Sequence, residues 1–320
     1  MSLIYNATFD KNTRKLSFED KAGNEIYSFT VPERGPAVDD ITKPLTFRAT
    51  QDGSKVWMGV RGTPRGGFRM SRDGGNTWTI YNFDIITLNA GDEVSIRSWA
   101  DRTSDQGLHE GFYFEMTGKI EAWHNVMSMY RPNDFATYNT VVKYAFCQLF
   151  KGCTSLTKAP VLPATTLADS CYYMMFYGCQ SLTKAPELPA TALAQNCYQY
   201  MFYGCNSLTK APELPATTLA NYCYQGMFYG CQSLTKAPEL PATALADSCY
   251  SYMFYGCQSL KKVRVSATTT ATDALKNWLD SVSATGNFYC DPNATIFPTN
   301  STSGIPQNWT RRNIADYPTT

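Results

Sequence analysis

The feature that most constrains this chain is a 26-residue period through its middle. A Phe-x-Gly-Cys signature recurs at that interval, beginning at Phe150, Phe176, Phe202, Phe228 and Phe254. Four full units follow one another (154–179, 180–205, 206–231 and 232–257), with a partial unit at about 135–153 and a degenerate one from 258. A unit this short cannot bury a core alone, so the units must stack into a solenoid.

The positions that stay constant between units indicate the inward face of each coil. In the first full unit they are Leu156, Ala159, Leu162, Leu167, Cys171, Met175, Phe176 and Cys179. Leu167, Cys171 and Met175 are spaced i, i+4, i+8, which predicts a short helix, and Gly178 is placed to end it. The segment 156–162 is too short and too bounded by proline for a helix, and we predict a short strand there. Each coil is thus expected to run strand, turn, helix, turn.

Proline recurs within the predicted strand. Its positions are Pro160, Pro186, Pro212 and Pro238. Because proline has no amide hydrogen to donate to a ladder, we expect a parallel sheet only two or three residues deep per coil.

Cysteine also recurs, in two columns. One column holds Cys171, Cys197, Cys223 and Cys249, and the other holds Cys179, Cys205, Cys231 and Cys257. A continuous column offers no unique disulfide pairing, so the columns predict buried free thiols that act as small apolar side chains, with disulfides between neighbouring coils as the alternative. No CxxC pair or nearby histidine favours a metal site.

The repeats resemble the BspA-like leucine-rich repeats of bacterial surface proteins. The similar residues are Tyr144-Ala145-Phe146, the recurring F-x-G-C-x-S-L core and the Leu-x-x-Ala/Val segment. The resemblance covers roughly 135–315 and implies a leucine-rich-repeat solenoid with a C-terminal cap, on a cell-surface or secreted binding protein. The prolines are a departure from the family pattern, because they stand where it has a strand residue.

The region before the repeats has a different pattern. Seven runs rich in β-branched and aromatic residues, separated by Gly, Asn and Asp turns, lie between 45 and 116 and predict an all-β sandwich. Three shorter runs within 1–35 predict a small meander, which would be marginal alone and is expected to pack on the sandwich or to form an oligomer with another chain. We expect a multi-domain α+β chain with a meander (1–36), a sandwich-like domain (37–132), the solenoid (133–262) and a cap (263–320).

Two further segments support specific expectations. Thr272 and Asp273 are placed to open a helix through Leu275, Trp278 and Val282 that covers the end of the solenoid. The run 71–78, Ser-Arg-Asp-Gly-Gly-Asn-Thr-Trp, fits the Asp-box pattern SxDxGxTW that is typical of sialidases. One such box in a region too short for a propeller favours a hairpin device over a glycosidase.

Several function classes are disfavoured by composition. A net charge of +1 gives no general attraction to nucleic acid or anionic membrane. No apolar run approaches the roughly 18 residues of a membrane span, and we expect neither a signal peptide in 1–10 nor an enzyme. The chain has only two histidines, and no GxSxG, HExxH or phosphate-loop motif. We therefore predict no catalytic residue, metal or cofactor.

Stacking turns single positions into columns, which supply the candidate ligand-binding residues. Lysines form a basic column at Lys158, Lys184, Lys210, Lys236 and Lys262. Glutamates form an acidic column at Glu187, Glu213 and Glu239. Tyrosines form one column at Tyr172, Tyr198, Tyr224 and Tyr250, and a second at Tyr177, Tyr203, Tyr229 and Tyr255. The charged columns could equally compensate each other between coils, and the tyrosines could pack within the core.

The sequence thus favours an extracellular adhesion protein that presents its repeats to a protein or glycan ligand. A structural or receptor-binding component of a phage particle is the alternative, because the N-terminal meander resembles attachment segments of virion proteins.

Overall fold

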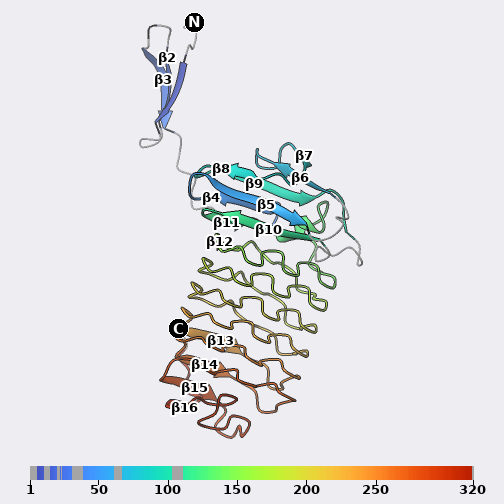
Figure 1. Ribbon diagram of the computed structural model, residues 1–320, viewed down its shortest axis with the longest axis vertical. Helices are drawn as coiled ribbons and strands as arrows, with labels where there is room; N and C mark the ends of the chain where they lie inside the picture. The colour runs from blue at the N-terminus through green and yellow to red at the C-terminus, as the bar shows by residue number, and fades with distance from the viewer. Residues whose placement is uncertain are drawn as a thin grey trace. The chain divides into compact units, whose positions relative to one another are not determined.

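The chain forms two compact units, residues 1–38 and 39–320. The structure, a computed structural model, describes residues 6–10, 15–19, 22, 24–30, 39–60, 67–102 and 111–318 (Figure 1). In the first unit, β1 (Asn6–Asp10), β2 (Lys15–Glu19) and β3 (Glu25–Thr30) form an antiparallel sheet in the order β1-β2-β3. The predicted meander of three strands is therefore confirmed.

The second unit begins with two sheets. One has the order β10-β5-β8 and the other the order β12-β11-β4-β9-β6-β7. The strands are β4 (Thr46–Ala49), β5 (Ser54–Val60), β6 (Phe68–Ser71), β7 (Thr79–Tyr81), β8 (Ile86–Leu88), β9 (Glu93–Ser98), β10 (Phe112–Thr117), β11 (Ile120–Trp123) and β12 (Leu156–Lys158).

Aromatic rings join the two sheets into one core. Phe47 of β4 meets Phe114 of β10 with ring centroids 4.7 Å apart, and Phe68 of β6 meets Phe112 of β10 at 4.8 Å. All seven strands that the sequence predicts between 45 and 116 are present. Strand β11, which directly follows β10 after the turn at Gly118, is not among the strands predicted from the sequence.

The first coil of the solenoid is built onto this core. Strand β11 pairs in parallel with β12, with Ile120 opposite Leu156. The ring of Phe150 stacks on Phe114 at 5.3 Å, and the thiol of Cys153 donates to the carbonyl oxygen of Phe114 at 3.0 Å. These contacts cross the domain boundary expected at 132/133, and independent folding of the two sides stays a prediction.

The described part of the chain contains no α-helix, so the α+β class is wrong and the protein is nearly all β. Two short 3₁₀ turns, η2 (Val126–Met129) and η3 (Ile314–Asp316), are its only helical elements within those residues. The segments predicted as helices are strings of overlapping turns in which every fourth residue has positive φ. In one coil these residues are Ser170 (54°), Met174 (52°) and Gly178 (74°).

Hydrogen bonding within these turn strings alternates along the backbone. The amides of Met175 and Tyr177 donate to the carbonyl three residues earlier, at Tyr172 and Met174, which closes a turn. The amides between them point to the next coil, where Phe176 N donates to Met201 O at 2.9 Å. Half of the amides therefore close the local turn, and the other half join neighbouring coils.

The turn string explains why the sequence suggested a helix. Inward side chains recur with a period of four, as in the pairs Cys171-Tyr172 and Met175-Phe176. Spacings of i, i+4, i+8 fit that period as well as the helical period of 3.6. The same substitution of turns for a helix occurs at 272–282, where Asp273, Asn277 and Ser281 have positive φ.

The solenoid core consists of side chains stacked on their equivalents in the next coil. Phe202 lies between Phe176 and Phe228 with centroid distances of 5.6 and 5.7 Å and nearly parallel rings. All of the phenylalanines in this column are fully buried. The inward assignment of the Phe-x-Gly-Cys column is confirmed.

The parallel sheet on the strand side is as thin as the prolines predict in the earlier coils, and it widens to five residues at β13 (Lys236–Leu240). Strand β12 has three residues, and the next two coils meet there through a bridge between Lys184 and Lys210. Strand β13 passes through Pro238, and its register with β14 (Lys262–Val265) shifts between Lys236 and Glu239. Pro238 thus interrupts the hydrogen-bonded ladder between β13 and β14, at a position that the sequence predicts.

The C-terminal part continues the stack. Strands β14, β15 (Gly286–Cys290) and β16 (Trp309–Asn313) extend the parallel sheet from β13 (Figure 1). Trp278 is fully buried, its ring lies 6.2 Å from that of Tyr250, and its indole nitrogen donates to Gly304 O. The predicted strands at 261–266 and 287–290 are confirmed, whereas the helix predicted from Thr272 is wrong.

All eleven cysteines are free and buried. In one column each thiol donates to a carbonyl of the preceding coil, as Cys205 does to Phe176 O at 3.2 Å and Cys231 to Phe202 O at 3.2 Å. Burial raises the pKa of these thiols, to about 12 for Cys249 and well above the ordinary value for Cys231. The predicted burial of the two columns is confirmed.

We predict that Phe202→Ala splits or markedly broadens the thermal unfolding transition. Removing a fully buried phenylalanine costs about 3–5 kcal/mol, and in a stack this loss acts on one coil and its two interfaces. Calorimetry of residues 39–320 measures the effect, with Lys210→Ala at an exposed site as the control. An unbroadened transition with the wild-type midpoint would contradict the assignment of Phe202 to the core.

We also predict that stability falls at alkaline pH. In the unfolded chain the thiols lose their protons near their ordinary pKa of about 8.5, whereas burial keeps them protonated in the folded chain. The unfolded state then binds fewer protons, so the free energy of unfolding decreases as pH rises above about 9. The melting temperature should be lower at pH 10 than at pH 8 under reducing conditions, and equal values would contradict thiol burial.

Candidate functional site

The charged columns lie on the strand side of the coils. Lys184, Lys210 and Lys236 are exposed, as are all three glutamates of the acidic column. A small groove of about 120 Å³ lies between two coils and is lined by residues that include Lys210, Glu213 and Glu239. In the described chain no ion pair joins a lysine of this column to a glutamate of the acidic one, so the two columns do not neutralise each other.

The ends of the charged columns differ from their middle. Lys158 forms an ion pair with Asp39 at 2.8 Å, and its ammonium group lies 3.7 Å from the ring centre of Trp123. Burial lowers the pKa of Lys158, while Asp39 partly offsets this effect. Glu239 pairs with Arg264 at 2.8 Å. Lys158 is therefore engaged within the fold, unlike the exposed lysines of the middle coils.

The first tyrosine column belongs to the core and not to the surface. Its members are Tyr172, Tyr198, Tyr224 and Tyr250, with exposed fractions of only 1–2%. The rings of Tyr172 and Tyr198 stack with centroids 5.8 Å apart, and burial raises the pKa of both phenols well above the usual value. These four candidates cannot contact a ligand in this conformation, and their assignment to a binding surface is corrected.

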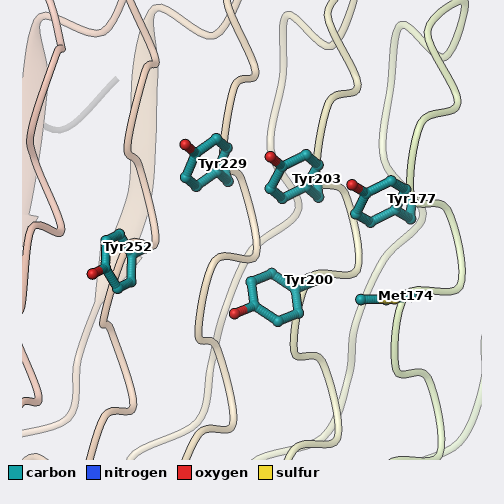
Figure 2. Close-up of a pocket in the computed structure, with 6 residues that line it drawn as sticks. All are labelled: Met174, Tyr177, Tyr200, Tyr203, Tyr229 and Tyr252. Carbon is teal, nitrogen blue, oxygen red and sulfur yellow. The ribbon is translucent and has the colours of Figure 1, made fainter.

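The second tyrosine column lies at the surface and forms a ladder. Tyr177, Tyr203, Tyr229 and Tyr255 stack with centroid distances of 4.5, 4.4 and 4.6 Å and nearly parallel rings. Burial raises the pKa of Tyr203 to about 12, with its two tyrosine neighbours adding to the shift. Figure 2 shows the hydroxyl groups of Tyr177, Tyr203 and Tyr229 all pointing the same way. Ring edges and hydroxyls are therefore presented as a row.

A second, interrupted row runs beside this ladder. At the equivalent position of successive coils it holds Met174, Tyr200, Gly226 and Tyr252. The ring of Tyr200 leans over Gly226 so closely that a Cβ atom there would overlap it. In the lower row of Figure 2 the ring of Tyr200 lies between Met174 and Tyr252, and it covers Gly226 of the next coil.

These two rows enclose an open groove of roughly 410 Å³, lined by Met174, Tyr177, Tyr200, Tyr203, Tyr229 and Tyr252. We call this surface the tyrosine face. Its walls combine apolar ring surface with phenolic hydroxyls, and at one end the ammonium group of Lys151 lies 5.2 Å from the ring centre of Tyr177 and 3.8 Å from Sδ of Met174. Such a lining suits a ligand that offers a flat or apolar face together with hydrogen-bonding groups.

The sequence identified the ladder as a column but did not favour it over the buried one. The two tyrosine columns can be distinguished by the residues next to each tyrosine in the sequence. Tyr177 stands directly before the conserved glycine of each unit, whereas Tyr172 follows the inward Cys171. In a period of four with paired inward residues, this places Tyr172 inside and Tyr177 outside.

The Asp-box motif forms the hairpin between β6 and β7. The carboxylate of Asp73 accepts hydrogen bonds from Thr77 N at 3.0 Å, Thr77 Oγ1 at 2.6 Å and Ser71 Oγ at 2.6 Å. These bonds, led by that of Ser71, hold its pKa well below the usual range. Gly74 and Gly75 take positive φ, and Trp78 Nε1 donates to Gly75 O. Every one of these contacts closes the turn, which agrees with the hairpin interpretation.

Metal-binding clusters and membrane-spanning helices are both absent from the described ranges. Within residues 39–60, 67–102 and 111–318 and the three N-terminal strands, no group of three or more His, Cys, Asp or Glu side chains is arranged to hold a metal ion. Over the same ranges, no helix has the length and hydropathy of a membrane span.

We predict that Gly226→Ala destabilises the protein more than Gly152→Ala does. Both glycines have positive φ, and replacing either imposes a backbone cost of about 1–2 kcal/mol. A Cβ atom at Gly152 meets nothing within 4 Å, whereas one at Gly226 meets the ring of Tyr200. Urea titration gives both free energies of unfolding, and the excess cost at Gly226 should disappear in a Tyr200→Ala background. Equal costs for the two glycines would show that Tyr200 does not lie over Gly226.

Comparison with known proteins gives one match. Residues 143–278 match the family model described as BspA type Leucine rich repeat region, in six copies. No curated protein and no solved structure matches the chain significantly.

Proposed function

We propose, from the BspA-type leucine-rich repeats that residues 143–278 form, that this chain is a binding protein that presents its repeat surface to a ligand. Proteins with such repeats are commonly surface adhesion or binding proteins, and the repeats themselves are generally non-catalytic. A protein or a glycan is the expected ligand, and a surface or secreted location is the expected place of action.

The observation that carries the proposal is the tyrosine face. Tyrosine is enriched at recognition sites because a large rigid ring and one hydroxyl group are presented at a low cost in side-chain entropy. The stacked ladder holds Tyr203 and Tyr229 rigid before any ligand arrives. The ring of Tyr200 lies over Gly226 and forms part of the groove wall between its own coil and that of Tyr252.

The charged columns give a second contact surface. Lys184, Lys210, Glu187 and Glu213 are exposed, and none takes part in an ion pair within the described chain. Rows of both signs fix the register of a partner and suppress wrong ones, more than they add affinity. The phage-particle alternative has no support from the structure or the comparisons, and we do not propose it.

We predict that the double variant Tyr203→Ala/Tyr229→Ala loses binding to the ligands that the wild-type protein selects on glycan and protein arrays. Truncation of central aromatic residues at an interface typically costs about 2 kcal/mol or more, which corresponds to a fall in affinity of at least roughly tenfold. Tyr222→Ala is the matched control, because Tyr222 is a surface tyrosine, 37% exposed, in the coil of Gly226 but outside the groove.

Titration of each selected ligand against the three proteins measures the effect. Retention of wild-type affinity by the double variant, with the same melting temperature, would show that ligands bind elsewhere and would contradict the proposal.

A further inference from the structure

A second unusual surface lies on the outward side of β6, β7 and β9, away from the tyrosine face. Arg69 of β6 lies directly opposite Ile80 of β7 on one side and Arg97 of β9 on the other. Trp78 and Trp99 are two residues from Ile80 and Arg97, so the alternation of a strand places them on the same side. We call these five residues the arginine–tryptophan patch.

The patch is built from two parallel cation–π pairs. The guanidinium carbon of Arg97 lies 4.1 Å from the ring centre of Trp78, and that of Arg69 lies 5.2 Å from the ring centre of Trp99. Trp99 is 51% exposed and Ile80 is 57% exposed. A Cβ atom at Gly67 would come within 3.0 Å of the Trp99 ring, so this glycine lets the indole lie close to the sheet.

Two like charges face each other across neighbouring strands in this patch, an arrangement that destabilises a sheet. Burial, and then the charge of Arg69, lowers the pKa of Arg97 below its usual value. In the part of the chain that the structure describes, no carboxylate forms an ion pair with either arginine. The two tryptophans stabilise the arginines through cation–π contacts, but no described carboxylate neutralises their charge, as is common at functional sites.

The other end of the same sheet holds a second cluster of tryptophan and cations, in which each cation is paired with a carboxylate. Trp123 of β11 lies under Arg48, at 5.2 Å, and under Lys158, at 3.7 Å. There each cation has a carboxylate of its own. Arg48 Nε donates to Glu93 at 2.9 Å, and Lys158 pairs with Asp39. In the cluster at Trp123 each cation is thus paired with a carboxylate. In the arginine–tryptophan patch no described carboxylate forms an ion pair with either arginine, and the Trp99 ring is exposed.

We infer that the arginine–tryptophan patch is a binding site for an acidic polysaccharide, whose carboxylate groups pair with Arg69 and Arg97. Guanidinium groups bind carboxylates through paired, charge-assisted hydrogen bonds. The arginines are cross-strand partners, whose Cβ atoms lie about 5 Å apart, so both guanidinium groups extend from one small area of the sheet and can pair with carboxylates of the same chain of sugars.

A sugar acid fits the patch better than an acidic peptide because of the indole. The exposed ring of Trp99 offers a flat apolar surface beside the cations, and the C–H face of a sugar ring can stack on such a surface. A uronic acid unit carries that face and the carboxylate on one rigid ring. It therefore meets both features of the patch, whereas a glutamate side chain supplies the charge alone.

The experiment measures binding of residues 1–320 to polygalacturonate by biolayer interferometry at low salt. Highly methyl-esterified polygalacturonan has the same backbone without the charges, and poly-glutamate has the charges without the sugar. We expect binding to polygalacturonate, none to the ester, and at least tenfold weaker binding to poly-glutamate. Arg69→Ala and Arg97→Ala should each lower the affinity about tenfold or more, and added salt should weaken it.

Arg48→Ala is the matched control, because Arg48 also stacks on a tryptophan of this sheet but is paired with Glu93. The affinity of this variant for polygalacturonate should equal that of the wild type. The melting temperature of Arg69→Ala should be unchanged or slightly higher, since one of two opposed like charges is removed. Absence of polygalacturonate binding, or binding that survives both arginine variants, would overturn the inference. Equally strong binding to poly-glutamate would also overturn it, because the partner would then be an acidic protein. A lower melting temperature for Arg69→Ala without loss of affinity would show that the arginine stabilises the fold and does not bind a ligand.

Discussion

The hydrogen bond between neighbouring coils is the interaction on which the rest of this structure depends. Within each turn string alternate amides close a local turn, and the amides between them, such as that of Phe176, donate to the next coil. Because buried backbone groups must be paired, this alternation sets both the spacing and the register of the stack. It also requires positive φ at every fourth residue. The repeat carries glycine at one of these positions in every unit and tolerates Ser, Asn, Met or Tyr at others, at a local cost.

Because the register between coils is fixed, equivalent side chains of successive coils contact one another along each column. The phenylalanines stack into the core, the thiols donate back to the preceding coil, and the tyrosine ladder reaches the surface with its rings parallel. The tyrosine face, which we propose as the recognition surface, is therefore a direct product of the packing. A single departure from the repeat, Gly226 in place of a larger residue, lets the ring of Tyr200 lie over the next coil and so shapes the groove. A surface built in this way can change its ligand by substitution at outward positions without altering the coil.

Much of this architecture follows from the sequence, and the failures have a physical cause. The period, the inward column of Phe202, the buried thiols and the proline-thinned sheet are predictable because each depends on which residues repeat. The helix expected through Leu167, Cys171 and Met175 is absent because a turn period of four and a helix period of 3.6 share the same short spacings. The burial of Tyr172 could not be separated from the exposure of Tyr177 until that period was known. The arginine–tryptophan patch was not predictable, since it depends on the pairing of β6 with β9, which are distant in sequence.

The most direct test of this account is the acceptor of a single backbone amide. Scalar coupling across hydrogen bonds, measured by NMR on the deuterated protein, identifies the carbonyl to which the amide of Phe176 donates. The structure predicts coupling to the carbonyl of Met201 in the next coil. Coupling to the carbonyl of Tyr172, four residues earlier, would be the signature of an α-helix and would contradict the turn string, the inter-coil ladder and the tyrosine face built on them.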